Sequence, residues 1–338
     1  MTMSASYFDL LKYAATGQAS PSMTGFDKLK ALAMAMSGTK KPAMNDYAAI
    51  AKIVRAGQAE QFFTIGEQII CTYTFTDGTE FDMPFDIVDF GTKALENGTV
   101  VPAMIIQSHW ATIETIDFDA AETGRPAEED YGGQIRQSGW NRWIKSAYRQ
   151  WLNSAAEEGN WWTAQNDYDE PPVALEHYKG FLCGLPAGFL AMLKPVKIET
   201  VRNYRDPDSA KYASTYEYDT TYDTFWIPSQ EEEYIEPNEP NHREGTAWQY
   251  WKDALAEEAA EKGELLPQKT YESSSKTHEL LARRRFGMEN HTKAVSVRLR
   301  SCYRTTSNSI RWIHTKGYIS SQYGASSKLR CTPVCAIC

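Results

Sequence analysis

The chain has 338 residues, of which 42% are hydrophobic and 12% aromatic, and its formal net charge at pH 7 is −9. This amount of apolar material predicts a globular protein with one large or two ordinary domains, and excludes a fully disordered chain. No run approaches the roughly 20 apolar residues of a membrane-spanning helix, and the start MTMSASYFDLLKY does not resemble a signal peptide. We therefore expect no membrane span and synthesis in the cytoplasm. Six cysteines are few for this length, and we expect free thiols.

Residues 1–58 are predicted to form an N-terminal helical segment. Apolar residues recur at helical spacing over 26–36. Asn45 is in position to cap a second helix, which Gly57 is expected to end.

Residues 59–125 are predicted to form a strand-rich subdomain. FFTIGEQIICTYTF, EFDMPFDIVDF and TVVPAMIIQS have β-type patterns, and Asp77-Gly78 is a turn signal between the first two.

Residues 126–338 are predicted to form a further domain with long irregular loops. Ser138 is in position to cap a helix over GWNRWIKSAYRQWLN, and TFWIPS is expected to be buried. The acidic run EEEYIEPNEPNHREG and the stretch DALAEEAAEKGE are expected to be solvated surface without chemistry. Alternating residues in AVSVRLRS predict a strand, and the tail LRCTPVCAIC predicts a buried one.

The amphipathic helix and the last strands supply a predicted set of core residues, and polar residues near the C-terminus supply an exposed set. The predicted core comprises Trp143, Trp151, Leu152, Val295, Val297, Leu299 and Val334. The predicted exposed set comprises Arg304, Asn308, Arg311 and Tyr323.

Three cysteines near the end of the sequence have a spacing that is found in metal sites. Cys331-x3-Cys335-x2-Cys338 has the spacing with which radical enzymes that use S-adenosylmethionine hold an iron–sulfur cluster. That motif needs a barrel downstream of it, and on a strand Cys338 would face away from the other two. The six histidines lack metal-ligand spacing, and no phosphate-binding glycine loop or nucleophile elbow is present. We therefore expect no metal, no cofactor and no catalytic residue, and hence no enzyme.

The C-terminal part has an unusual charge balance. No Asp or Glu follows Glu289 in a chain that contains 44 of them, whereas eight Lys and Arg residues do. Residues 303–328 interleave aromatic side chains with Arg, Asn, His, Ser and Thr. Antibody paratopes have this composition, because tyrosine and tryptophan give contact area at low entropic cost. An ordinary polar sheet that pairs with the acidic middle of the chain is the alternative.

The same composition could bind single-stranded nucleic acid, but no nucleic-acid module accompanies it and the whole chain is acidic, so nucleic acid is not expected. The candidate ligand-binding residues are Tyr303, Arg304, Ser307, Asn308, Arg311, Trp312, His314, Tyr318, Ser320, Gln322, Tyr323, Ser326 and Lys328.

The order of several motifs resembles a phage-associated domain family. VRLRSCYRTTSNSIRWIHTKGYIS followed by LRCTPVCAI resembles that family's closing W-x-L-R-S segment, polar aromatic loop and G-V-R-P-A-hydrophobic end. DTFWIPSQEEEY resembles its strand that leads to a serine and an acidic turn. The family's W-x-x-S-x-x-R-x-W-L-N helix is matched here by Trp143, Ser146, Arg149, Trp151, Leu152 and Asn153. The resemblance covers about residues 60–338.

Members of this family are similar to the C-type-lectin-like fold of formylglycine-generating enzymes, and several are variable proteins of diversity-generating retroelements. The resemblance implies an α+β protein with a C-type-lectin-like fold and long irregular loops, preceded by a strand-rich unit and N-terminal helices. It also implies that residues 302–330 form a displayed surface whose codons are diversified.

The expected function is therefore ligand binding by a phage virion protein that recognises a host-cell surface protein or glycan. The N-terminal segment would attach to other virion proteins or form a homo-oligomer. Two alternatives stay open. One is a structural capsid or tail decoration protein with the same fold. The other, less favoured, is a formylglycine-generating-type enzyme, which would need a reactive cysteine pair or a copper site.

Overall fold

The computed structural model describes most of the chain between residue 40 and the C-terminus. Within strands between residues 286 and 298 and between 309 and 329 it describes the backbone alone. The predicted helix over 26–36 lies outside the described residues, as does Ser138. The described residues are 40–112, 115–122, 124–126, 139–202, 217–235, 244–262, 286–287, 290–294, 297–302, 309–313, 319–324 and 328–338.

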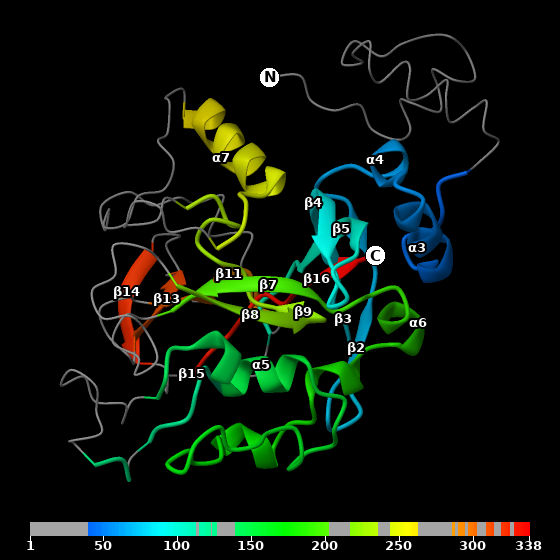
Figure 1. Ribbon diagram of the computed structural model, residues 1–338. Coiled ribbons are helices and arrows are strands. Elements are labelled where there is room, and N and C mark those ends of the chain that lie inside the picture. Colours follow the sequence, from blue (N-terminus) through cyan, green and yellow to red (C-terminus); the bar gives the residue numbers. More distant parts are fainter. Residues whose placement is uncertain are drawn as a thin grey trace, which may run out of the picture.

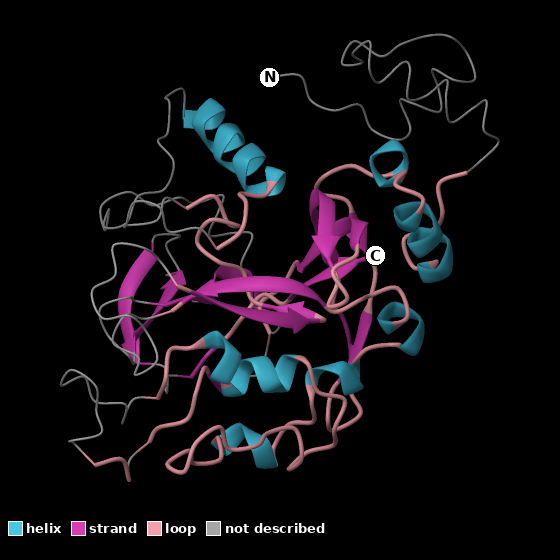
Figure 2. Cartoon of the chain, viewed as in Figure 1, coloured by secondary structure: helices cyan, strands magenta, loops and turns pink. Residues whose placement is uncertain are grey.

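Helices and antiparallel sheets alternate along the described chain, which makes the fold α+β (Figure 2). The central sheet has five strands, and its C-terminal strand lies between strands from much earlier parts of the chain (Figure 1). It thus takes strands from both sides of the predicted boundary at residue 125. In spatial order its strands are β1 (Gln68–Ile69), β4 (Phe85–Ala94), β5 (Val100–Ser108), β16 (Val334–Ile337) and β9 (Phe225–Trp226).

The other strands form smaller antiparallel sheets. Three strands, β12 (Val297–Cys302), β13 (Ser309–Ile313) and β14 (Ile319–Gly324), pair in that order. The remaining pairs are β2 (Thr72–Thr74) with β3 (Glu80–Asp82), β7 (Val196–Val201) with β8 (Tyr218–Asp223), β6 (Ile116–Asp117) with β15 (Lys328–Leu329), and β10 (Phe286–Gly287) with β11 (Asn290–Ala294).

The first described helix confirms the prediction with a shifted cap. Helix α3 spans Tyr47–Arg55, and the Asp46 side chain, not Asn45, accepts a hydrogen bond from the Ala49 N–H at 3.2 Å. Gly57 follows the helix with a φ of +68°, a backbone conformation that glycine adopts at little cost. The next residues form helix α4 (Ala59–Phe62), so the predicted strand over FFT is wrong at its start.

The predicted tryptophan-rich helix is shorter than its pattern suggests. A 3-10 turn, η3 (Trp143–Lys145), precedes helix α5 (Ala147–Leu152). Ser146 caps α5, and its Oγ accepts from the Arg149 N–H at 3.1 Å, so the prediction of Ser138 as the cap was wrong. The remaining helical elements are η4 (Val173–Glu176), η5 (Phe181–Gly184), α6 (Ala187–Leu190) and α7 (Gln249–Lys262).

The core confirms the predicted set where side chains are described. The side chain of Val297 and all of Val295 lie outside the described residues, as do the side chains of the predicted exposed set. Residues 225–229 of TFWIPS are buried as predicted, whereas Thr224 is half-buried. The fully buried members of the predicted core are Trp143, Trp151, Leu152, Leu299 and Val334.

Phe181 joins three parts of the core. Its ring centroid lies 5.2 Å from that of Trp151, 5.1 Å from that of Phe225 and 5.2 Å from that of Tyr73. These contacts connect α5, the central sheet and the β2–β3 hairpin. All six cysteines are free, and five are buried. None of the described helices is long and apolar enough to cross a membrane.

Candidate functional site

The predicted ligand-binding segment begins and ends in the buried framework. Ser301 and Cys302 at the end of β12 are buried, and residues 331–338 are buried after it. Between these points β13 pairs with both neighbours, and Trp312 lies opposite Arg298 on one side and Ser320 on the other. The segment is therefore held at both ends and contains two paired strands.

The thirteen candidate residues divide by what the structure describes. Backbone positions in strands are described for Arg311, Trp312, Ser320, Gln322, Tyr323 and Lys328. Outside the described residues lie Tyr303, Arg304, Ser307, Asn308, His314, Tyr318 and Ser326, together with the side chains of all thirteen.

The N-terminal anchor of this segment is a buried arginine. Arg300 is 1% exposed, and its Nη1 donates to a Glu232 carboxylate oxygen and to the Ile227 carbonyl at 3.0 Å. Its Nη2 donates to the Glu244 carbonyl, and its backbone N–H donates to the Pro228 carbonyl at 3.0 Å. Strand β12 is thereby fixed to the two segments that flank residues 236–243.

Ser301 and Glu244 extend this anchor. The Glu244 carboxylate accepts from Ser301 Oγ and from the Val201 N–H at 2.9 Å, and so connects β12 to β7. Ser301 Oγ also accepts from the Gln230 N–H at 3.0 Å. We call Arg300, Ser301, Glu231, Glu232 and Glu244 the Arg300 cluster.

The prediction that the acidic run is solvated surface was wrong for its described part. Glu231, Glu232, Glu233 and Glu244 are all at most 6% exposed. In the alanine-glutamate stretch, Glu258 is also buried. For Glu232 and Glu244 the physical reason is that Arg300, two backbone N–H groups and the Ser301 hydroxyl donate to their carboxylates, which burial otherwise disfavours strongly.

Titration in this cluster is strongly perturbed. Burial, and then the carboxylate of Glu244, raise the pKa of Glu231 to about 8. Burial alone would lower the pKa of Arg300, but the Glu232 carboxylate more than offsets this, so the pKa is raised. Arg300 therefore stays charged.

The motif residues around α5 fix the end of β8. Trp143 Nε1 donates to the Asp223 carboxylate at 2.9 Å, and Arg149 Nε donates to it at 2.7 Å. Asn153 Oδ1 accepts from the N–H groups of Thr224 and Phe225 at 2.8 and 3.0 Å. These residues thus make scaffold contacts.

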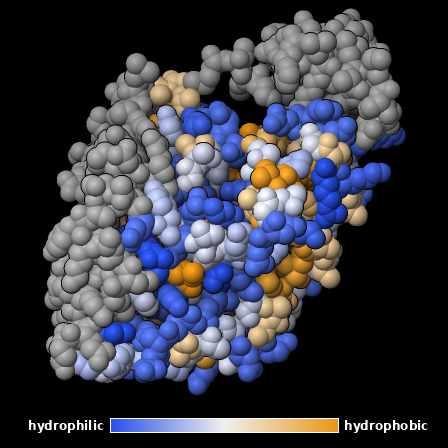
Figure 3. All heavy atoms as spheres, viewed as in Figure 1, coloured by the Kyte–Doolittle hydropathy of each residue, from blue (hydrophilic) through white to orange (hydrophobic). Residues whose placement is uncertain are grey.

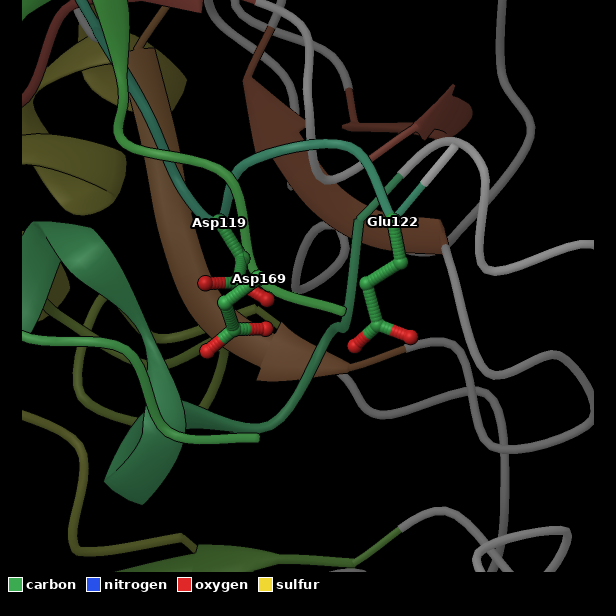
Figure 4. A group of neighbouring side chains, drawn as sticks. All are labelled: Asp119, Glu122 and Asp169. Carbon is green, nitrogen blue, oxygen red and sulfur yellow. The ribbon is translucent and has the colours of Figure 1, made fainter. Parts of the chain in front are cut away.

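A separate group of three carboxyls lies beyond β6. Asp119, Glu122 and Asp169 each offer an oxygen within 4.8 Å of the others (Figure 4). Gly139 helps to build this group, since its φ is +82° and a Cβ there would lie 2.5 Å from the Asp119 carbonyl oxygen. The adjacent Trp140 N–H can therefore donate to Asp119 Oδ2 at 3.0 Å.

Hard cations such as Ca²⁺ take oxygen ligands of this kind, so these carboxyls could hold one. Arg125 already places a positive charge there, because its Nε donates to the Glu122 carboxylate. Asn166 Nδ2 donates to Glu122 at 2.9 Å and to Asp169 at 2.6 Å. Within the described part of the chain this is the one such group found, and it contains neither a histidine nor a cysteine.

This group was not predicted from the sequence, in which only Asp119 and Glu122 lie close together. Burial, and then the charge of Asp169, raise the pKa of Asp119 well above its usual value. Burial likewise raises the pKa of Asp169. The folded protein therefore binds protons here that the unfolded chain releases.

We expect Asp119→Asn to stabilise the protein in the presence of a chelator. Because the pKa of Asp119 is raised on folding, ionisation costs stability as the pH rises, and a neutral amide avoids this cost. The gain should reach about 1 kcal/mol at pH 8 and shrink toward pH 5. Urea unfolding at both pH values measures it.

Calcium supplies the control for this variant. If the carboxyls hold a cation, calcium would stabilise the wild-type protein and Asp119→Asn would lose that effect. A variant that is less stable than the wild-type protein in chelator at pH 8 would contradict the prediction.

One histidine pairing was also missed. His109 Nδ1 lies 2.8 Å from Asp86 Oδ2, which also accepts from Tyr250 Oη at 3.1 Å. Gln68 Nε2 donates to Asp86 Oδ1 at 3.0 Å. This carboxylate joins β1, β4 and α7, so we assign the pairing a structural role.

The contacts define an α+β protein in which a buried arginine fixes strand β12 to the segments around Glu232 and Glu244. Residues 116–337 match the family described as a domain of unknown function, DUF6273, and the chain therefore belongs to this family. No curated protein and no solved structure gives a significant match.

Proposed function

We propose that this protein is a ligand-binding phage virion protein, with a C-type-lectin-like fold, that recognises a host-cell surface protein or glycan. The ligand would contact the candidate residues between 303 and 328. The single observation that carries the proposal is the fixation of this segment at both ends. Arg300 and Ser301 hold the preceding strand, and pairing of β16 with β5 and β9 holds the chain that follows.

This arrangement supports display of residues 303–328 to a ligand, because the residues that hold both ends lie outside this segment. A scaffold that is over-determined by buried contacts tolerates changes in the residues that it carries. The resemblance to variable proteins of diversity-generating retroelements supports diversification of residues 302–330. The N-terminal segment would then serve attachment to other virion proteins or self-association.

Adsorption of virions to host cells tests the proposal. Trp312→Ala with Tyr323→Ala is expected to abolish adsorption, with each change costing about 2 kcal/mol or more, since large aromatics dominate binding energy when desolvated. The melting temperature should shift by no more than a few degrees. Particles must be shown to carry the protein.

Two exposed valines provide a matched control. Val100 and Val173 are 63% and 60% exposed, and Figure 3 shows a described surface on which hydrophilic residues predominate. Changing both to alanine should leave adsorption intact. Normal adsorption by the aromatic double variant, combined with less stable particles, would favour the decoration-protein alternative.

Diversification has its own test. Sequencing the 3′ end of the gene in sibling phages should show substitutions concentrated in codons 302–330. A near-repeat template and a reverse transcriptase gene should lie nearby. An invariant 3′ end would remove diversification from the proposal and leave ligand binding to the adsorption test.

A further inference from the structure

The Arg300 cluster buries more carboxyl groups than cations. Glu231, Glu232 and Glu244 are 6%, 2% and 0% exposed, and Arg300 is the guanidinium among them. Lys93 Nζ, which lies 5.2 Å from the centre of the Trp226 ring, contributes a positive charge beside Glu232. Burial lowers the pKa of this lysine. Three ionised carboxylates would outnumber the positive charges described in this cluster, and burial makes such an excess costly.

Hydrogen bonds show which carboxyls are stabilised as anions. Glu232 accepts from Arg300 and from the Ser229 N–H at 3.1 Å. Glu244 accepts from Ser301 and the Val201 N–H. Glu231 lies next to both of these carboxylates, and burial with the Glu244 charge keeps its pKa near 8. At neutral pH Glu231 therefore retains its proton.

We propose that the Arg300 cluster is a pH-sensitive latch on strand β12, closed while Glu231 is protonated and loosened when this proton is lost to solvent at alkaline pH. Among the described residues, the charged groups that act on Glu231 are Glu244 from the segment before α7, Arg300 from β12, and Glu232 in the same turn. Ionisation adds a third carboxylate to one guanidinium.

The inference goes beyond ligand binding and does not depend on it. Opening the latch would release Arg300 and Ser301, and with them the strand that leads into residues 303–328. The test therefore follows β12 directly, and uses no ligand.

The first measurement is urea unfolding from pH 5 to pH 9, with Glu231→Gln as an isosteric mimic of the protonated acid. A carboxyl group whose pKa is raised on folding stabilises the folded protein at pH values below its unfolded pKa of 4.5. This stabilisation is lost as the pH rises toward about 8. The wild-type folding constant, divided by that of the variant, should thus fall by about tenfold per pH unit in mid-range. Glu231→Met, a second neutral side chain, should show the same trend.

Glu199→Gln is the matched control, because the Glu199 side chain is 52% exposed. Its pH profile should run parallel to that of the wild-type protein. Parallel profiles of the wild-type protein and Glu231→Gln would overturn the inference.

The second measurement is hydrogen exchange of a peptide that contains β12, compared between proteins at one pH so that intrinsic rates cancel. At pH 9 this peptide should exchange at least tenfold faster in the wild-type protein than in Glu231→Gln, and this ratio should shrink as the pH falls toward 5. A peptide from β4 and β5 should change less. Equal exchange of β12 at pH 9, even with divergent stabilities, would show that Glu231 titrates without releasing this strand and would refute the latch.

Discussion

Trp151→Ala is expected to lower the free energy of unfolding by about 3–5 kcal/mol. The Trp151 side chain is fully buried, its Nε1 donates to the Lys179 carbonyl at 3.0 Å, and its ring packs on those of Tyr148 and Phe181. Truncation leaves a cavity where α5 meets the central sheet and removes the donor of a partly buried hydrogen bond. Urea unfolding followed by circular dichroism measures the loss.

The control for Trp151→Ala is a change within the predicted display segment. Arg304→Ala, Asn308→Ala, Arg311→Ala and Tyr323→Ala should each stay within about 0.5 kcal/mol of the wild-type protein, the range of ordinary surface substitutions. If these changes cost as much as Trp151→Ala, the division of the chain into scaffold and display surface would be wrong.

The sequence predicted those helices and turns that depend on residues close together in the chain. The helix over α3 has apolar residues at helical spacing and a capping acid directly before it, and the Asp77-Gly78 turn separates two strands. The choice between neighbouring caps was not predictable, because Asn45 and Asp46 are equally good caps by type. The prediction of Ser138 as a cap was wrong for a similar reason, because Ser146 carries the same hydroxyl group and directly precedes α5.

Burial of the acidic run could not be predicted from local composition. Glu232 meets Arg300 across 68 positions of the chain, and Ser301 meets Glu244 across 57. A run of glutamates with prolines is typical of solvated surface, and only the fold brings it to the one arginine that neutralises it. Two motifs of the sequence did contain the residues that meet here. Arg300 and Ser301 of the first contact Glu232 and Gln230 of the second.

The strand order of the central sheet likewise could not be predicted from local sequence. β16 was predicted as a buried strand from its apolar residues, but its neighbours β5 and β9 could not be predicted. Gln107 near the end of β5 donates to Thr332 across 225 positions. The group of three carboxyls, Asp119, Glu122 and Asp169, also depends on segments that are distant in the sequence. Asn166 donates to Glu122 across 44 positions of the chain.

Arg300→Met is expected to cost about 3–5 kcal/mol of unfolding free energy at pH 8, although methionine fills a similar volume. Removing one partner of a buried ion pair leaves the other charge uncompensated, and here the Glu232 carboxylate and the Glu244 backbone carbonyl would each lose a donor. The loss relative to the wild-type protein should shrink at pH 5. Burial and the Glu244 charge raise the pKa of Glu231 to about 8 against the opposing effect of Arg300, so removal of Arg300 raises this pKa further and costs stability only at pH values where Glu231 would ionise.

Glu232→Gln separates the charge effect from lost packing. In the Arg300→Met background it should restore about 1 kcal/mol or more at pH 8, because it removes the orphaned carboxylate, whereas alone it should destabilise the protein. A double variant no more stable than Arg300→Met would mean that the arginine acts through its bonds to the carbonyls of Ile227 and Glu244 rather than through charge. If residues 303–328 bind ligand as proposed, host adsorption by virions that carry Arg300→Met should fall together with stability, since β12 holds the start of this segment.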